Sequence, residues 1–170
     1  MVKRYFTSAI VYASLAMAGG VFYREFTKYA GFSGQTNLSF VHTHYFVLGM
    51  FFFLALALLE KAFAFSQSKG IKAWVTIYHV GLNITTACLF LRGLAQASQA
   101  VLSSGLNASI SGMSGIGHAL LGAAMLALLL ENRLYKVIAL AVLGAAAFAV
   151  VVWAARQPAG KYVNGHRKGH

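Results

Sequence analysis

Long apolar segments alternate with short polar segments along the chain. A helix needs about 20 mostly apolar residues to cross the hydrocarbon core of a bilayer. Five segments approach or reach this length, and they predict spans at 5–23, 43–61, 73–95, 115–132 and 136–155. The pattern therefore predicts an all-α fold, a polytopic transmembrane helical bundle of four to five spans.

The polar connections between these segments predict how the chain is organised. Residues 94–114 are rich in serine and glycine, so we expect an extension of the third helix and then a loop lying over the bundle. Residues 131–136 predict a tight turn. Residues 1–156 are expected to form a single transmembrane domain, and residues 157–170 a basic, mobile tail. Outside this tail the lysines and arginines favour an N-terminus on the cytoplasmic side of the bacterial inner membrane.

Composition excludes several classes of protein. The chain is 59% hydrophobic and 10% charged, whereas a soluble domain carries roughly 25% charged residues. A soluble enzyme and a disordered chain are both excluded by these values. The net charge is +11, but the basic residues stand mostly singly at the ends of apolar segments, where they anchor a protein to lipid. We therefore expect the lipid bilayer as a partner, and no nucleic acid.

Polar residues gather at one end of the predicted bundle. Alternate helices bring the end of the first, the start of the second, the end of the third and the start of the fourth to one membrane surface. Ionisable residues at membrane depth are costly and usually face the bundle interior, where they mark a site. The candidates at this surface are His42, His44, His118, Arg24, Arg92 and Glu25.

The spacing of the histidines distinguishes their roles. His42 and His44 are separated by about 200° around a helix, so one helix does not direct both at one centre. His44 fits the helix proper and His42 its cap. His118 follows Gly115 and Gly117, whose missing side chains allow a flat group or another helix to approach closely.

These features predict a b-type heme with two histidine ligands near one membrane surface. His44 and His118 would be the axial ligands, and His42 would support a ligand or replace one. Arg24 and Arg92 stand at the level where guanidinium groups pair with heme propionates. Such a heme serves electron transfer, or the sensing or handling of a diatomic gas. This interpretation agrees with two kinds of partner. One is a redox partner or quinone, and the other is a second copy of the chain in a homo-oligomer, bound through helix faces that carry small residues.

Two other interpretations stay open. The same region predicts a copper or zinc site with His42, His44, His118 and Glu25 as metal ligands. Alternatively, the protein is a non-catalytic structural or assembly subunit, in which polar residues only bond neighbouring helices; we expect this role for His79. The chain has no aspartate and no CxxC, HExxH, P-loop or GxSxG motif, so the sequence leaves open whether the protein is an enzyme.

Several motifs resemble an uncharacterised bacterial family of small multi-helix membrane proteins. The resemblance covers residues 5–130, leaves the fifth apolar segment outside, and implies no activity. The motifs are Tyr23–Lys28 (YREFTK), Gly34–Leu38 (GQTNL), His42-Thr43-His44 with Leu48-Gly49, Arg92-Gly93, and Gly115–His118 (GIGH).

A more distant resemblance is to the heme-copper oxidase superfamily. There a similar stretch opens the second helix, and a histidine of that helix binds a low-spin heme. Val41-His42-Thr43-His44 followed by Leu48-Gly49 is similar to that stretch. The chain lacks the further histidines for a copper centre and a second heme. The resemblance therefore implies heme or metal binding, and not oxygen reduction.

Overall fold

The computed structural model describes residues 1–67 and 70–130, together with residues 144, 145, 148, 150 and 152. Every long element in this part of the chain is a helix. Contacts divide the chain into one unit of Met1–Leu134 and a second of Tyr135–His170. In the second unit the five described residues are helical. The elements of the first unit are α1 (Val2–Tyr29), α2 (Leu38–His44), the π-helix η1 (Tyr45–Phe51), α3 (Phe52–Phe63), the 3₁₀ turn η2 (Phe65–Gln67), α4 (Ile71–Ala97) and α5 (Ser104–Leu130).

Four helical segments in the described part of the chain are long and apolar enough to cross a membrane. They are Val2–Tyr29, Leu38–Phe63, Ile71–Ala97 and Ser104–Leu130. The prediction of an all-α, multi-span transmembrane bundle is thus confirmed. The predicted fifth span at 136–155 falls largely, and the predicted turn at 131–136 entirely, outside the described residues, as does the predicted tail at 157–170.

The prediction for residues 104–114 was wrong, because these residues form the first turns of α5 and not a loop. Two of their serine side chains bond carbonyls within the helix itself. The hydroxyl of Ser109 donates to the carbonyl of Gly105 at 2.9 Å, and that of Ser111 to the carbonyl of Asn107 at 3.0 Å. Local bonds of this kind let a serine-rich segment stay helical.

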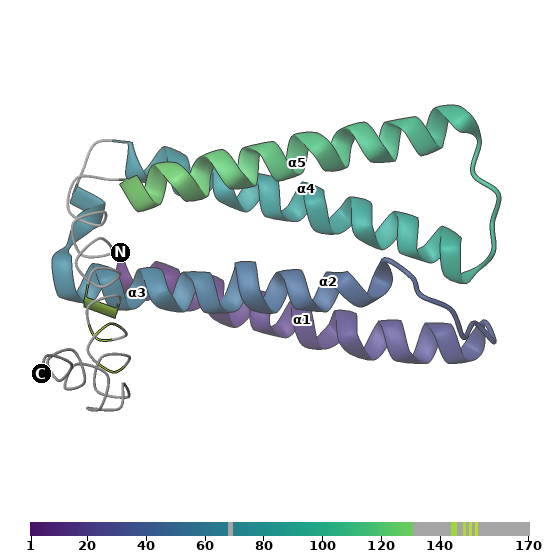
Figure 1. Cartoon of the computed structure of the whole chain (residues 1–170), viewed down its shortest axis with the longest axis horizontal. Helices are drawn as coiled ribbons and strands as arrows, with labels where there is room; N and C mark the ends of the chain where they lie inside the picture. Colours follow the sequence, from purple (N-terminus) through teal and green to yellow (C-terminus); the bar gives the residue numbers. More distant parts are fainter. Residues whose placement is uncertain (68–69, 131–143, 146–147, 149, 151, 153–170) are drawn as a thin grey trace, which may run out of the picture. The chain divides into compact units, whose positions relative to one another are not determined.

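The helices of the first unit form two antiparallel pairs. Helix α1 runs along the segment α2–η1–α3, and α4 runs along α5 (Figure 1). Helix α2 also contacts α4, which joins the two pairs near one end. The buried core draws on α1, α3, α4 and α5 and is rich in aromatic rings, among them Tyr5, Tyr12, Phe53 and Tyr78.

Helices α4 and α5 pack closely through glycine. A Cβ atom on Gly81 would lie 2.6 Å from the backbone nitrogen of Leu121, and one on Gly117 would lie 2.6 Å from the Oγ1 atom of Thr85. Membrane helices commonly use small residues to approach one another in this way. The glycine of the GIGH motif that precedes His118 therefore has a packing role against α4.

The segment before α2 is bound to the end of α4. Thr36 is buried, and its hydroxyl donates to the carbonyl of Gly93 at 2.7 Å. The backbone amide of Asn37 donates to the Oε1 atom of Gln96 at 2.7 Å. Gly93 lies so close to the backbone of Leu38 that a Cβ atom has no room there. These contacts give Thr36, Asn37 and Gly93 a structural role in joining the two segments.

Because this segment is held in place, α2 begins at Leu38, earlier than the predicted start at residue 43. His42 therefore lies inside the helix and not at its cap, which corrects the prediction. The hydroxyl groups of Ser39 and Thr43 bond to carbonyls three residues earlier, at 2.8 and 2.9 Å. Polar side chains that suggested the boundary of a helix thus lie within α2.

Candidate functional site

The structure brings His44 and His118 together from two different helices. Their ring centres are 6.2 Å apart, and the ring planes are perpendicular. His44 is half-buried and His118 is exposed. Segments more than 70 positions apart in the sequence thus meet at one pair of imidazoles.

Both imidazoles are oriented by the same kind of bond. The Nδ1 atom of His44 lies 2.8 Å from the carbonyl of Phe40, and the Nδ1 atom of His118 lies 2.8 Å from the carbonyl of Ser114. A carbonyl oxygen only accepts hydrogen bonds, so each Nδ1 carries the hydrogen. In the neutral rings each Nε2 then presents a lone pair, which is the form that binds a metal.

The α5 helix leaves open space beside His118. Gly115 lies three positions before this histidine and Gly122 four positions after it, on the same helix face. A Cβ atom at either glycine would meet nothing within 4 Å among the described residues. The exposure of His118 follows from these missing side chains, and a planar group could lie against α5 here.

The two histidines lie at the same depth in the bundle. By helical rise, His44 lies about 9 Å from Leu38, which contacts Gly93. His118 lies about 10 Å from Ser111, which binds Arg92. Both imidazoles are therefore nearly two turns inside the level of Arg92 and Gly93, because α2 and α5 begin earlier than expected.

Arg92 holds the start of α5 against the end of α4. One of its terminal nitrogens donates to the carbonyl of Asn107 at 3.2 Å and to the hydroxyl of Ser111 at 2.8 Å. The guanidinium has further N–H donors beyond these two bonds. Arg92 therefore stands on the surface side of the histidine pair, with donors left for an anionic group.

Arg24 lies on the same surface as Arg92 but is less closely tied to the histidines. Its side chain is 84% exposed and its Nε atom lies 3.9 Å from a carboxylate oxygen of Glu25, which is 60% exposed. An ion pair as exposed as this contributes little to stability. In the described residues neither side chain contacts His44 or His118.

His42 faces a different neighbour from His44, as the angular separation predicted. Its ring stacks on Tyr23 with centres 6.5 Å apart, and its side chain packs over Gly20 of α1. The buried Nδ1 atom has no hydrogen-bond partner among the residues that the structure describes. His42 is therefore not part of the pair formed by His44 and His118.

The described residues do not gather the four groups of the predicted copper or zinc site. In this part of the chain no three histidine, cysteine or acidic side chains lie close enough together to hold a metal ion. His44 and His118 meet, whereas His42 and Glu25 lie elsewhere.

A second polar group, which the sequence did not reveal, connects α1 to α4. The hydroxyl of Tyr12 lies 2.6 Å from the Nδ1 atom of His79 and accepts a bond from the amide of Asn83 at 3.1 Å. The hydroxyl of Tyr45 in turn donates to Asn83 at 3.2 Å. His79 thus has the interhelical bond expected of it, but Tyr12 and Tyr45 stand in apolar segments with no distinguishing sequence signal.

Comparison with other proteins leads to a family. No curated protein and no solved structure matches the chain. One family model matches residues 2–134, and its description is "Protein of unknown function (DUF2871)". This range contains all four described spans and both histidines of the pair, and so the chain belongs to the DUF2871 family.

Proposed function

We propose that the protein binds one b-type heme between His44 and His118, with these imidazoles as axial ligands. The observation that carries the proposal is the separation of 6.2 Å between the two ring centres. A metal-bound imidazole nitrogen lies about 2.0–2.1 Å from the metal and about 1.1 Å from its own ring centre, so an axial pair has ring centres roughly 6 Å apart. The separation of the two ring centres therefore matches that of an axial pair.

The number of nearby ligands favours heme over a free metal ion. A porphyrin supplies four nitrogens and requires only two ligands from the protein, whereas zinc is almost always held by three or four protein ligands. Only two imidazoles meet here among the described residues. Copper or zinc bound by the same histidines is the alternative, and a structural subunit is a further one.

The surroundings of the pair also suit a planar group. The open positions at Gly115 and Gly122 leave the face of α5 free beside His118. Both Nδ1–H groups are already bonded to carbonyls, which supports the Nε2 atoms as the ligands. Arg92 stands toward the membrane surface, where its remaining N–H groups would pair with a propionate.

When bound, such a heme supplies one-electron chemistry or a site for a diatomic gas. The two histidines would hold the heme, with each imidazole kept in one tautomer. The surrounding apolar helices would limit the access of water. The basic residues outside the tail at 157–170 favour a cytoplasmic N-terminus. We therefore propose that the protein lies in the bacterial inner (cytoplasmic) membrane with its N-terminus inside.

Absorbance spectroscopy of the detergent-purified full chain, isolated from heme-supplied cells, tests the proposal. We expect a Soret band and the sharp reduced bands of a low-spin, six-coordinate heme. His44→Ala and His118→Ala should abolish this spectrum, whereas His79→Ala should retain it because His79 bonds Tyr12. Wild-type protein with no Soret band, and no copper, zinc or iron near one equivalent, contradicts cofactor binding and favours the structural subunit.

A pair of glycine variants separates the site from the fold. Gly115→Leu would fill the open space beside His118, and Gly112→Leu would fill equally open space six positions, nearly two turns, before His118. Both should unfold at the wild-type denaturant concentration. We expect only Gly115→Leu to lose heme; equal heme content in the two variants would contradict the predicted position of the porphyrin.

A further inference from the structure

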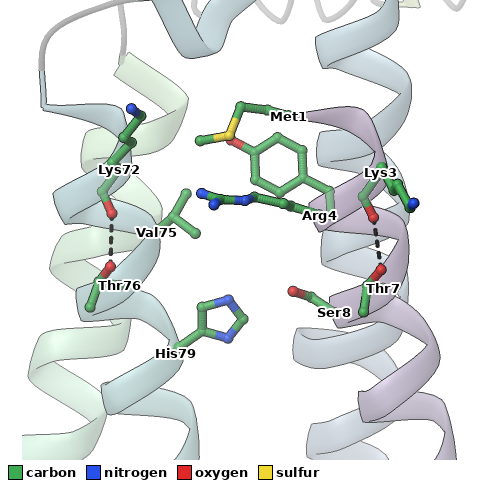
Figure 2. Close-up of a pocket in the computed structure, with 10 residues that line it drawn as sticks. Met1, Lys3, Arg4, Thr7, Ser8, Lys72, Val75, Thr76 and His79 are labelled. Carbon is green, nitrogen blue, oxygen red and sulfur yellow. Dashed lines mark hydrogen bonds between the residues drawn. The ribbon is translucent and has the colours of Figure 1, made fainter.

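A basic cavity lies between α1 and α4 at the end of the bundle opposite to Arg92. Its volume is about 510 Å³, and it is lined by Lys3, Arg4 and Lys72, by the polar residues Thr7, Ser8, Thr76 and His79, and by apolar groups. Figure 2 shows the Arg4 guanidinium extending from α1 toward α4, with Ser8 and His79 directed into the space below it. Hydroxyl, imidazole and guanidinium groups thus converge from two helices on one cavity.

Among the described residues that line this cavity, none is acidic to balance its positive charge. Glu25 lies near the other end of α1, and Glu60 accepts bonds from the backbone amide and hydroxyl of Ser66 and lies 3.9 Å from the Met1 ammonium group. The third acidic residue, Glu131, is outside the described residues. Arg4 and Lys72, on the two helices that flank the cavity, favour an anionic ligand over a neutral one such as a quinone.

The cavity continues along the α1–α4 seam and becomes progressively apolar. A second cavity of about 200 Å³ shares Thr7, Ser8 and His79 with the first and reaches Leu15. A third, of about 530 Å³, shares Leu15 and is lined mainly by aliphatic and aromatic side chains further along the two helices. The third cavity includes Ala18, Phe22, Ala87, Phe90 and Leu91.

We propose that this seam, which we call the α1–α4 groove, binds a phospholipid with an anionic head group. The phosphate lies between Arg4 and Lys72, where a guanidinium offers paired N–H donors to phosphate oxygens. An acyl chain follows the seam past Leu15 toward Phe22 and Phe90. Charge at one end and apolar surface at the other match the two halves of such a lipid. This proposal does not rest on the proposed heme site.

Native mass spectrometry of the full chain in detergent, titrated with phosphatidylglycerol or phosphatidylcholine, tests the proposal. Wild-type protein should retain phosphatidylglycerol in preference to phosphatidylcholine. Each cation near an anionic group contributes about a fivefold change in affinity. We therefore expect Lys72→Gln to weaken phosphatidylglycerol binding about fivefold and the double variant Arg4→Gln/Lys72→Gln roughly 25-fold.

The matched control is Lys61→Gln, which removes an exposed lysine from α3 at the same end of the bundle but outside the groove. Lys61→Gln should change phosphatidylglycerol binding by less than about twofold, because salt screens the attraction between the head group and a lysine outside the groove. A loss equal to that of Lys72→Gln would show only general attraction to the basic surface and would overturn the proposal.

Two further measurements distinguish a lipid from a free anion. Ala87→Phe should fill the apolar end of the groove and weaken phosphatidylglycerol binding, and an excess of inorganic phosphate should not displace the lipid. If inorganic phosphate displaces it completely and Ala87→Phe has no effect, the cavity binds a free anion and the lipid proposal is wrong. Unfolding of every variant in sodium dodecyl sulfate should occur at the wild-type concentration, which excludes misfolding as the cause.

Discussion

The α4–α5 contact offers a direct test of how packing supports the histidine pair. Gly117→Ala would place a methyl group 2.6 Å from the Oγ1 atom and 2.9 Å from the backbone nitrogen of Thr85, whereas ordinary contacts begin at 3.4 Å. The helices would have to separate by about 0.8 Å, and overpacking of this kind costs about 1–3 kcal/mol. Since His118 follows directly, its ring would move away from His44.

The matched control is Gly115→Ala in the same helix. Its added methyl group would meet no atom within 4 Å among the described residues, and both substitutions make the same change in helix propensity. We expect Gly115→Ala to change the free energy of unfolding by less than about 0.5 kcal/mol, or to stabilise the helix slightly. The difference between the two variants therefore isolates the cost of close packing.

Unfolding of the detergent-purified protein by sodium dodecyl sulfate, followed by circular dichroism, measures this difference. Gly117→Ala should unfold at a lower detergent fraction than Gly115→Ala and should retain less heme under the site proposal. Equal stability of the two variants would refute the argument that α4 and α5 require glycine at residue 117. A stability loss without heme loss would show that the site tolerates the displacement.

Three further substitutions test single interactions. Tyr12→Phe removes the hydroxyl that bonds His79 and Asn83, and should lower the free energy of unfolding by about 0.6–1.7 kcal/mol in the same denaturation assay; a wild-type midpoint would contradict this bond. Thr36→Val keeps the shape of a buried side chain but removes its bond to Gly93, so we expect a loss of about 1–3 kcal/mol, and faster proteolysis of residues 30–37 would confirm that the bond holds this segment. Arg92→Lys should weaken heme retention, measured by transfer of heme to apomyoglobin, because an ammonium does not reproduce the guanidinium fork; unchanged transfer would separate Arg92 from the site.

The positions of the four described spans could be predicted from the sequence because crossing a membrane depends on local properties. A segment must be long and apolar, and its backbone bonds must be satisfied within the helix itself. The exceptions are the start of α2, which precedes the predicted residue 43, and the start of α5, where Ser109 and Ser111 looked like loop residues. Their side chains bond carbonyls in the preceding turn. A hydropathy pattern does not show whether a serine makes such a bond.

The choice of His44 and His118 also came from the sequence, since ionisable residues are rare at membrane depth. Their meeting, and the different direction of His42, depend on how α2 packs against α1 and how α5 lies against α4. Those rotations are set by contacts such as Gly20 with His42 and Gly81 with Leu121, between residues distant in the sequence. Likewise, only the tertiary structure joins Arg4, Lys72 and His79 around one cavity, because a pattern along one helix does not specify which neighbour each side chain faces.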